Sequence, residues 1–191
     1  MTPARPWLFP LVLLALAFLP MVIEARRSKA NERALRAAGA IEPRGDVYAV
    51  MQVAYPACFL AIILDAWLRG RVPTVTSFVP GLVVFACAKG LKYWAIATLG
   101  GRWTFRVLVP PGSPRTTAGP YRLVRHPNYL AVAGELGGMA LMARAPLAGL
   151  ACVLLFGALM LARIRVEERA LASAPAQPSA ATSEGSRNRA L

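Results

Sequence analysis

The chain has 191 residues, which is enough for one domain or a small helical bundle. Hydrophobic residues make up 57% of it and charged residues only 16%, yet the net charge is +13. The high hydrophobicity excludes a disordered chain, and the long apolar blocks argue against a soluble nucleic-acid binder. One histidine and three cysteines exclude a disulfide scaffold and a histidine-cluster metal site, so no metal is expected. Cys58, Cys87 and Cys152 are therefore predicted to be packing residues.

Five apolar blocks predict the helices, at residues 7–23, 47–67, 78–98, 128–143 and 146–162. A helix needs about 20 residues to span a bilayer, and the second and third blocks meet this length. The first block resembles a signal peptide, but no small-residue cleavage site follows it, so a retained helix is favoured. The last two blocks are shorter, and a tight turn at 143–146 joins them into a helical hairpin. The predicted fold is an all-α integral membrane protein of about five transmembrane helices.

The segments outside these blocks predict the domain organisation and the orientation. Residues 24–39 are expected to continue the first span as a cytoplasmic helix, residues 1–171 to form one domain, and residues 172–191 to be a disordered tail. If the predicted helices cross the membrane in turn, the segments 24–46, 99–127 and the part after residue 162 lie on one side of it. These segments contain 16 of the 22 Lys and Arg residues, and the segments on the opposite side contain four. The positive-inside rule then puts the N-terminus outside the inner or plasma membrane and both long loops in the cytoplasm. The expected partner of the basic loops is the lipid bilayer, not nucleic acid.

The most polar part of the chain runs from Gly101 to Leu130 and contains several Pro and Gly breakers. The aromatic and aliphatic residues within it predict an ordered, functional loop. Pro127 suits the first position of the next helix, whose N-terminus would favour an anionic group. After the last apolar block, Arg163 and Glu167 stand four residues apart, so they share a helix face. Taken alone, His126 could be a capping residue and Arg163 a snorkelling anchor.

Two charges fall inside predicted spans, where charges are expensive and by default functional or paired. Glu135 lies two turns into the fourth block and Lys92 lies near the end of the third. Either Glu135 forms the floor of a substrate pocket, or Glu135 and Lys92 form a structural pair. Lys89 could be a third partner or could snorkel.

Three motifs occur together at a specific spacing: Gly119-Pro120-Tyr121-Arg122, Arg125-His126-Pro127-Asn128-Tyr129, and Arg163-x-x-x-Glu167-Glu168. Over roughly residues 90–171, this arrangement resembles the isoprenylcysteine carboxyl methyltransferase family of membrane enzymes. The resemblance implies S-adenosylmethionine as the cofactor, bound by a cytoplasmic loop and helix end.

The resemblance also implies roles for individual residues. Arg163 matches an arginine near the reacting group and is expected to be catalytic, whereas Arg106 stands where eukaryotic members have a cofactor-contacting Gln. Glu135 is the other expected catalytic residue, because of its depth in the membrane and not because of the resemblance. The expected cofactor-binding residues are Ser113, Pro114, Arg115, Thr116, Tyr121, Arg125, His126, Pro127, Asn128, Tyr129, Glu167 and Glu168. Charge supports this set, because a carboxylate such as Glu167 can pair with the cofactor's ammonium group.

The expected reaction is methylation of a lipophilic small-molecule acceptor at the membrane. Bacterial relatives are associated with O-methylation of long-chain phenols or pyrones, and a carboxylate acceptor is also compatible; a phospholipid or thiol acceptor is the alternative. A second class is an NADPH-dependent reductase of the sterol-reductase type, against which the pattern at 163–168 argues. A third class, a non-catalytic membrane protein, is disfavoured by the ordered polar loop.

Overall fold

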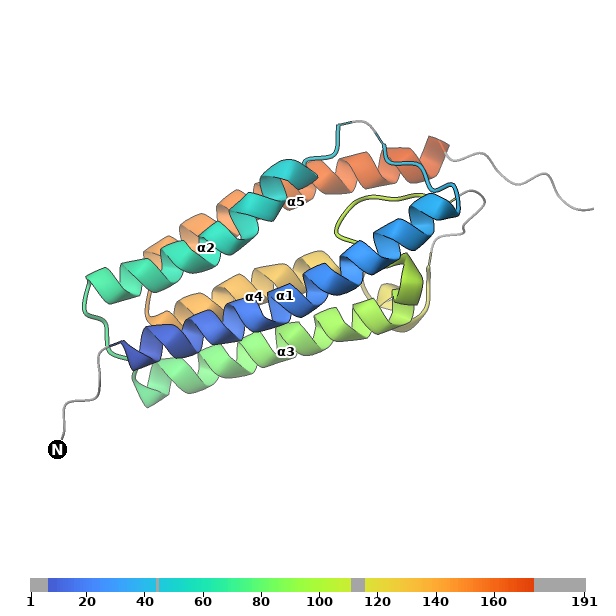
Figure 1. Ribbon diagram of the computed structural model, residues 1–191. Helices are drawn as coiled ribbons and strands as arrows, with labels where there is room; N and C mark the ends of the chain where they lie inside the picture. Colours follow the sequence, from blue (N-terminus) through green and yellow to red (C-terminus); the bar gives the residue numbers. More distant parts are fainter. Residues whose placement is uncertain (1–6, 44, 111–115, 174–191) are drawn as a thin grey trace, which may run out of the picture.

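The computed structural model describes residues 7–43, 45–110 and 116–173. These residues form five long helices and two short 3-10 turns (Figure 1). The long helices are α1 (Leu8–Ala37), α2 (Tyr48–Leu68), α3 (Val75–Leu99), α4 (Pro127–Ala143) and α5 (Pro146–Ser173). The short turns η1 (Gly100–Arg102) and η2 (Gly119–Arg122) lie between α3 and α4. All five apolar blocks are therefore helical, as predicted.

The helix boundaries follow local chemistry. Thr74 precedes α3 and forms a reciprocal capping box with Ser77, which satisfies backbone donors at the helix start. Pro127 is in the first turn of α4, as predicted, because its missing N–H is one that a helix leaves unpaired there. Arg144 ends α4 in a left-handed conformation, with φ at 55°, and so makes the tight turn into α5. Residues 24–37 continue α1 without a break, which confirms the predicted extension of the first helix.

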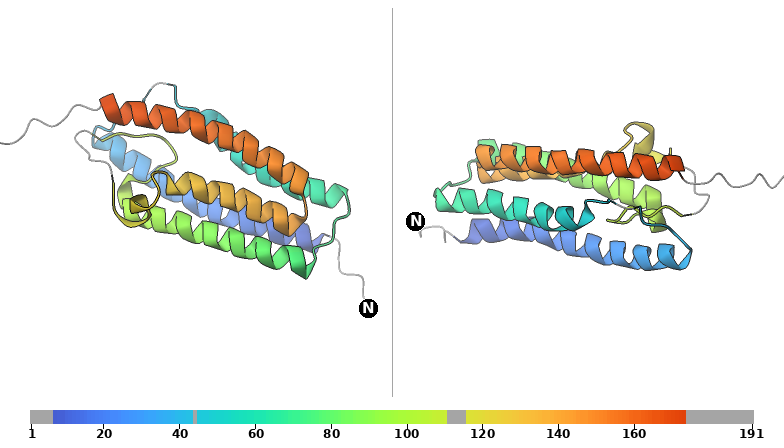
Figure 2. Two further views of the ribbon diagram at one scale, coloured as in Figure 1. Left: turned by 180° about the vertical axis from the view of Figure 1, so that it is seen from behind. Right: turned by 90° about the horizontal axis from the view of Figure 1, so that it is seen from above.

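Helices consecutive in the chain run antiparallel, and the five helices form an elongated bundle (Figure 2). Helices α3 and α4 approach each other most closely, since glycines line their contact. A Cβ atom at Gly138 would lie 2.7 Å from the backbone nitrogen of Phe85, so only glycine fits there. Small residues allow this kind of close backbone approach between membrane helices.

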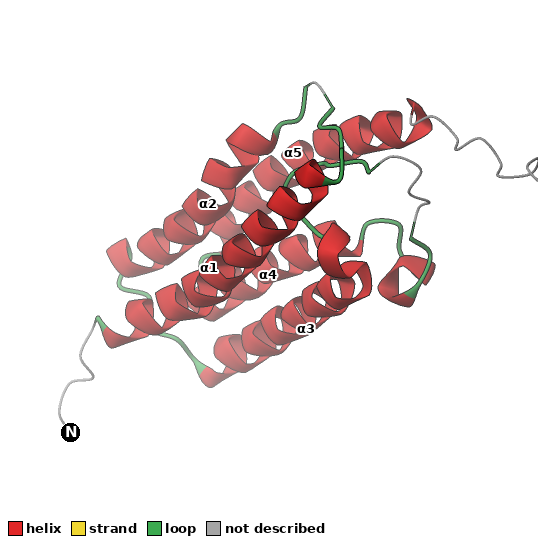
Figure 3. Ribbon diagram, turned by 45° about the vertical axis from the view of Figure 1, so that its right-hand side comes forward, coloured by secondary structure: helices red, strands yellow, loops and turns green. Residues whose placement is uncertain are grey.

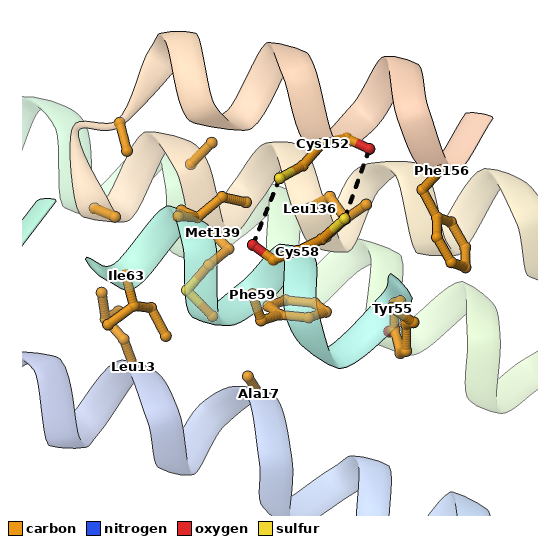
Figure 4. Packing of buried hydrophobic residues seen from close by; sticks show 14 of the residues in the cluster. Leu13, Ala17, Tyr55, Cys58, Phe59, Ile63, Leu136, Met139, Cys152 and Phe156 are labelled. Carbon is orange, nitrogen blue, oxygen red and sulfur yellow. Dashed lines mark hydrogen bonds between the residues drawn. The ribbon is translucent and has the colours of Figure 1, made fainter. Parts of the chain in front are cut away.

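The apolar core lies between α1, α2, α4 and α5 (Figure 4). Cys58 of α2 and Cys152 of α5 are buried in it, and each thiol donates to the backbone carbonyl of the other residue, with Cys152 Sγ 3.6 Å from Cys58 O. Two of the three cysteines are thus packing residues, as predicted. The prediction is wrong for Cys87, which is exposed on α3. In a membrane helix both faces are apolar, so an apolar block does not reveal which side faces protein.

The outer surface suits a lipid environment. Large aliphatic side chains are exposed on several helices, among them Leu19 at 65%, Val53 at 65% and Leu154 at 64%. Four helical segments of the described chain are long and apolar enough to cross a membrane: 8–37, 48–68, 75–102 and 146–169. Helix α4, with 17 residues, is about 26 Å long and is the most buried of the five. Figure 3 shows helices joined only by loops, and the single β-type contact in the described residues pairs Ile41 with Val109.

The two ends of the bundle differ. At one end, short turns join α2 to α3 and α4 to α5, where the Arg144 guanidinium donates to the carbonyl of Val72 at 3.0 Å. At the other end, α1 and α5 finish, α2 and α4 begin, and the long connection between α3 and α4 folds over them (Figures 1 and 3). This second end carries the motif residues of the sequence.

Candidate functional site

The first turn of α4 brings several motif residues to the loop end of the bundle. His126 is the residue before the helix, and Asn128 and Tyr129 occupy its first turn. Just upstream, Tyr121 belongs to the short turn η2, which begins at Gly119. Two properties of this position favour glycine. Its φ is +54°, which favours glycine, and a Cβ atom there would overlap the Thr98 side chain.

Two adjoining cavities occur at this end. The first, named here the end cavity, has a volume of about 140 Å³. It is lined by eight of the residues between Leu99 and Val109, and by Tyr121, His126 and Glu167 among others. The second, the inner cavity, has a volume of about 310 Å³ and extends between the helices; its lining includes Met21, Met51, Tyr55, Lys92, Val132 and Phe156. Four residues line both cavities: Thr104, Asn128, Tyr129 and Arg163.

A carboxylate and two aromatic rings form the polar wall of the end cavity. The Tyr129 hydroxyl donates to Glu167 Oε2 at 3.2 Å, and the His126 ring stacks on the Tyr129 ring with 5.5 Å between centroids. His126 Nδ1 lies 3.9 Å from Glu167, and Nε2 lies 3.7 Å from Glu168. His126 Nε2 and Asn128 Oδ1 are buried without a hydrogen-bond partner. Buried polar atoms are rarely left unpaired, so these two atoms are available to form hydrogen bonds with a polar ligand.

Tyr121 closes another side of the end cavity as a neutral phenol. Burial of the ring and the nearby Glu167 carboxylate raise the pKa of Tyr121 to about 12. Both effects disfavour the phenolate. Besides these rings, the end cavity is lined by the Glu167 carboxylate and by the guanidinium groups of Arg102, Arg106 and Arg163, so its lining carries charges of both signs.

Arg163 stands at the junction of the two cavities and is 5% exposed. One guanidinium nitrogen donates to the backbone carbonyl of Phe105, and the other lies 3.7 Å from Asp46 Oδ1 and 3.8 Å from the Met51 sulfur. The Asp46 carboxylate is itself fixed, since it accepts from the backbone N–H of Tyr48 at 3.2 Å. Arg163 is therefore a positioned side chain and not a mobile anchor.

Residues of helix α1 also hold the site in place, and the sequence did not predict this role. Asn31 donates to the backbone carbonyls of Gly100 and Trp103, at 3.1 and 2.7 Å, and Ser28 accepts from the N–H of Phe105 at 2.8 Å. These contacts hold the segment whose Phe105 carbonyl binds Arg163. The sequence signal was weak: a few short polar residues within a helix that otherwise looked like a basic surface extension.

Arg106 lines the end cavity but is occupied by protein partners. Its guanidinium lies 2.6 Å from Glu42 Oε1 and 3.6 Å from Glu32, and it stacks 4.5 Å from the centre of the Tyr48 ring. Burial opposes ionisation of Glu42, but hydrogen bonds from Arg106 and Arg36 prevail and hold the pKa of this carboxyl below its usual value. Arg106 thus joins the loops around the cavity.

A second group of charges lies inside the bundle. Lys89 lies 2.9 Å from Glu24 and 3.2 Å from Glu135, and Lys92 lies 2.8 Å from Glu24 and 3.3 Å from Glu135. The Tyr55 hydroxyl donates to Glu135 and accepts from Lys92. We name these five residues the buried charge cluster. Glu135 and Lys92 therefore form the structural pair that was one of the two predicted alternatives, and Lys89 is a third partner. The sequence did not predict that Glu24 and Tyr55 belong to this cluster.

The remaining predicted site residues are less central in the structure. Thr116 and Arg125 are described but do not line either cavity, and Arg125 is exposed. Pro127 is buried at the start of α4, where its role is to begin the helix. The predicted residues 113–115 lie outside the described residues.

Comparison with known proteins identifies the family. The family model for isoprenylcysteine carboxyl methyltransferases (ICMT) matches residues 81–173, which include every lining residue of the end cavity. The uncharacterized protein YpbQ of Bacillus subtilis (strain 168) is 30% identical over 162 residues, covering 84% of this chain and 95% of the relative. An uncharacterized protein of Haemophilus influenzae is 28% identical over 160 residues, covering 83% and 90%. No solved structure matches. The chain belongs to the isoprenylcysteine carboxyl methyltransferase (ICMT) family.

Proposed function

We propose that this protein is an S-adenosylmethionine-dependent methyltransferase that methylates a lipophilic acceptor at the membrane. The observation that carries the proposal is the pair of adjoining cavities that share Asn128, Tyr129 and Arg163. A polar cavity at the bundle end suits a charged cofactor, and a cavity between apolar helices suits a lipid-like acceptor. Their junction is where the two reactants would meet.

The residues of the end cavity fit this cofactor. Glu167 would pair with its ammonium group through a charge-assisted hydrogen bond. The unpaired His126 Nε2 and Asn128 Oδ1 would bind its polar groups, and the Tyr121 and Tyr129 rings would face its adenine or its sulfonium. When bound, S-adenosylmethionine supplies a methyl group attached to a positively charged sulfur.

Arg163 would orient the acceptor. Asp46 and the Phe105 carbonyl fix its guanidinium, which keeps further N–H donors for an acceptor oxygen at the junction. A permanently protonated guanidinium cannot take a proton, but it stabilises an oxygen that is already anionic. The geometry therefore favours O-methylation of an acidic acceptor, a long-chain pyrone enol or carboxylate, whose proton is lost to water before binding. A long-chain phenol, whose ordinary pKa is about 10, would need the neighbouring guanidinium to lower that pKa.

We also propose that all five helices span the membrane and that the end cavity faces the cytoplasm. The described basic residues of 24–46 and 99–127 lie at this end of the bundle, and the positive-inside rule puts such loops on the cytoplasmic side. The cofactor would reach its site from the cytoplasm, and the acceptor would arrive from the bilayer.

Equilibrium binding to the purified full-length protein in detergent tests the cofactor assignment. We expect radiolabelled S-adenosylmethionine to bind, NADPH not to compete, and Glu167→Ala to lower the affinity about tenfold or more, because one charge-assisted bond is lost from a partly exposed site. Asp65→Ala removes a carboxylate at the opposite end of the bundle and is the matched control. Undiminished affinity of Glu167→Ala, or tight binding of NADPH, would contradict the proposal.

A further inference from the structure

A third cavity, larger than the other two, lies at the opposite end of the bundle. It has a volume of about 490 Å³ and is lined by the start of α1, the end of α2 and the turn at 70–73 that leads toward α3. We name it the far cavity. The described residues that line it include none of the motif residues, so the proposed methyl transfer does not use it.

The far cavity is lined mainly by apolar side chains and lies at the lipid-facing surface. Leu13, Ile63 and Ala66 form the buried part of its lining, whereas Leu8 and Trp67 line it and are exposed. Exposed apolar side chains of a membrane helix face the acyl chains of the bilayer. Apolar cavities do not hold ordered water, and they accept apolar ligands. The cavity therefore suits an acyl chain.

Positive charge gathers beside the far cavity. Arg71 lines it, donates to the backbone carbonyl of Arg144 and lies 3.8 Å from Asp65 Oδ2. Arg69 Nε lies 2.6 Å from Oδ1 of the same carboxylate. The Arg144 guanidinium donates to the carbonyl of Val72, which also lines the cavity. Three guanidinium groups thus surround one carboxylate, and the excess charge is positive.

Arg71 keeps hydrogen-bond donors for a ligand. A guanidinium carries five N–H donors, on Nε, Nη1 and Nη2. In the described part of the chain only Nη1 of Arg71 has polar partners, which are the Arg144 carbonyl and Asp65. The side chain is partly exposed, so a ligand can reach it. Paired donors of this kind match the oxygens of a phosphate group.

The order of these groups along the helices matches the order of groups in a phospholipid. Trp67 is in the last turn of α2, and tryptophan is typical of helix ends at the level of the lipid headgroups. Arg71 follows it in the turn, outside the helix. Leu13 and Ile63 lie farther along α1 and α2, away from this end. A cationic group therefore stands at one end of an apolar cavity.

We propose that the far cavity binds an anionic phospholipid, with one acyl chain between α1 and α2 and the phosphate at Arg71. The excess positive charge favours an anionic headgroup, such as that of phosphatidylglycerol, over a zwitterionic one. In the orientation proposed above, this lipid belongs to the outer leaflet. A ligand that binds only the folded protein also stabilises it.

Native mass spectrometry of the full-length protein in detergent tests the inference with two lipids. Phosphatidylglycerol and phosphatidylcholine with the same acyl chains are added separately, and the affinity for the first bound lipid is measured. We expect the wild type to bind phosphatidylglycerol about fivefold to tenfold more tightly, because one charge-assisted contact distinguishes the headgroups. Phosphatidylglycerol should also raise the melting temperature more than phosphatidylcholine does.

Two variants separate the headgroup from the acyl chain. Arg71→Gln should abolish the preference between the two lipids, whereas Arg27→Gln, at an exposed position farther along α1, is the matched control and should keep it. Val12→Trp puts a larger side chain into the cavity and should weaken both lipids about tenfold with an unchanged ratio. Val83→Trp, at an exposed position on α3, is its control.

Several results would overturn the inference. Equal affinity of the wild type for the two lipids would show that the headgroup is not recognised. A preference that persists in Arg71→Gln but is lost in Arg27→Gln would place the lipid at the other end of α1. Undiminished binding by Val12→Trp would exclude the acyl chain from the cavity, and this variant decides if Arg71→Gln does not fold. None of these results bears on the proposed methyltransferase activity.

Discussion

The buried charge cluster makes a strong prediction about stability. Lys92 is 1% exposed and faces both Glu24 and Glu135, so replacing it by Met leaves two buried carboxylates with only Lys89. Removing one partner of a buried ion pair costs about 3–5 kcal/mol. For a chain of this size, that corresponds to a loss of about 10 °C in the melting temperature. Glu24→Gln should cause a similar loss, because it leaves one positive charge in excess.

The double variant Glu24→Gln/Lys92→Met distinguishes charge balance from packing. It leaves Lys89 and Glu135 as a neutral pair 3.2 Å apart, so we expect it to be more stable than either single variant. The assay is thermal unfolding of the purified protein in detergent. The exposed pair Arg69–Asp65, at 2.6 Å, provides the control, and Arg69→Met should cost less than about 1 kcal/mol. If the losses of the single variants simply add in the double variant, charge balance is not what holds the cluster.

Three further outcomes are expected. Arg163→Lys keeps the charge but loses the planar fork of donors, so turnover in a methylation assay should fall by about a hundredfold while cofactor binding changes little. Arg165→Lys, on the exposed face of the same helix, is the control and should behave like the wild type in that assay. Reporter fusions after Arg36 and Arg71 should read cytoplasmic and external respectively, and a cytoplasmic signal at Arg71 would refute the five-span orientation. The pKa of Glu42 is lowered in the folded state from its ordinary 4.5, so the stabilising contribution of this carboxylate is present above that pH and is lost as the pH falls. The melting temperature of Glu42→Gln should therefore lie below that of the wild type at neutral pH, and the two should converge at acidic pH.

The sequence by itself determined the helices and the identity of the motif region. Helix formation in a membrane chain is local, because each apolar segment must satisfy its own backbone hydrogen bonds. The starts and ends at Pro127 and Arg144 are also local, since they depend on proline geometry and a single left-handed residue. The motifs that contain His126, Tyr129 and Glu167 carry a family resemblance, which implied that these residues share a site, and the structure joins the last two by a hydrogen bond.

Only the tertiary structure decided which distant charges share a site. Glu24 looked like the first residue of a basic cytoplasmic helix, yet rotation and depth of α1 in the bundle place its carboxylate between Lys89 and Lys92. Asp46 was one acid in a basic loop until the fold placed it beside Arg163. Pairing of this kind depends on how helices are rotated and offset against one another. A uniformly apolar helix carries no amphipathic pattern that fixes either quantity, which is also why the exposure of Cys87 was missed.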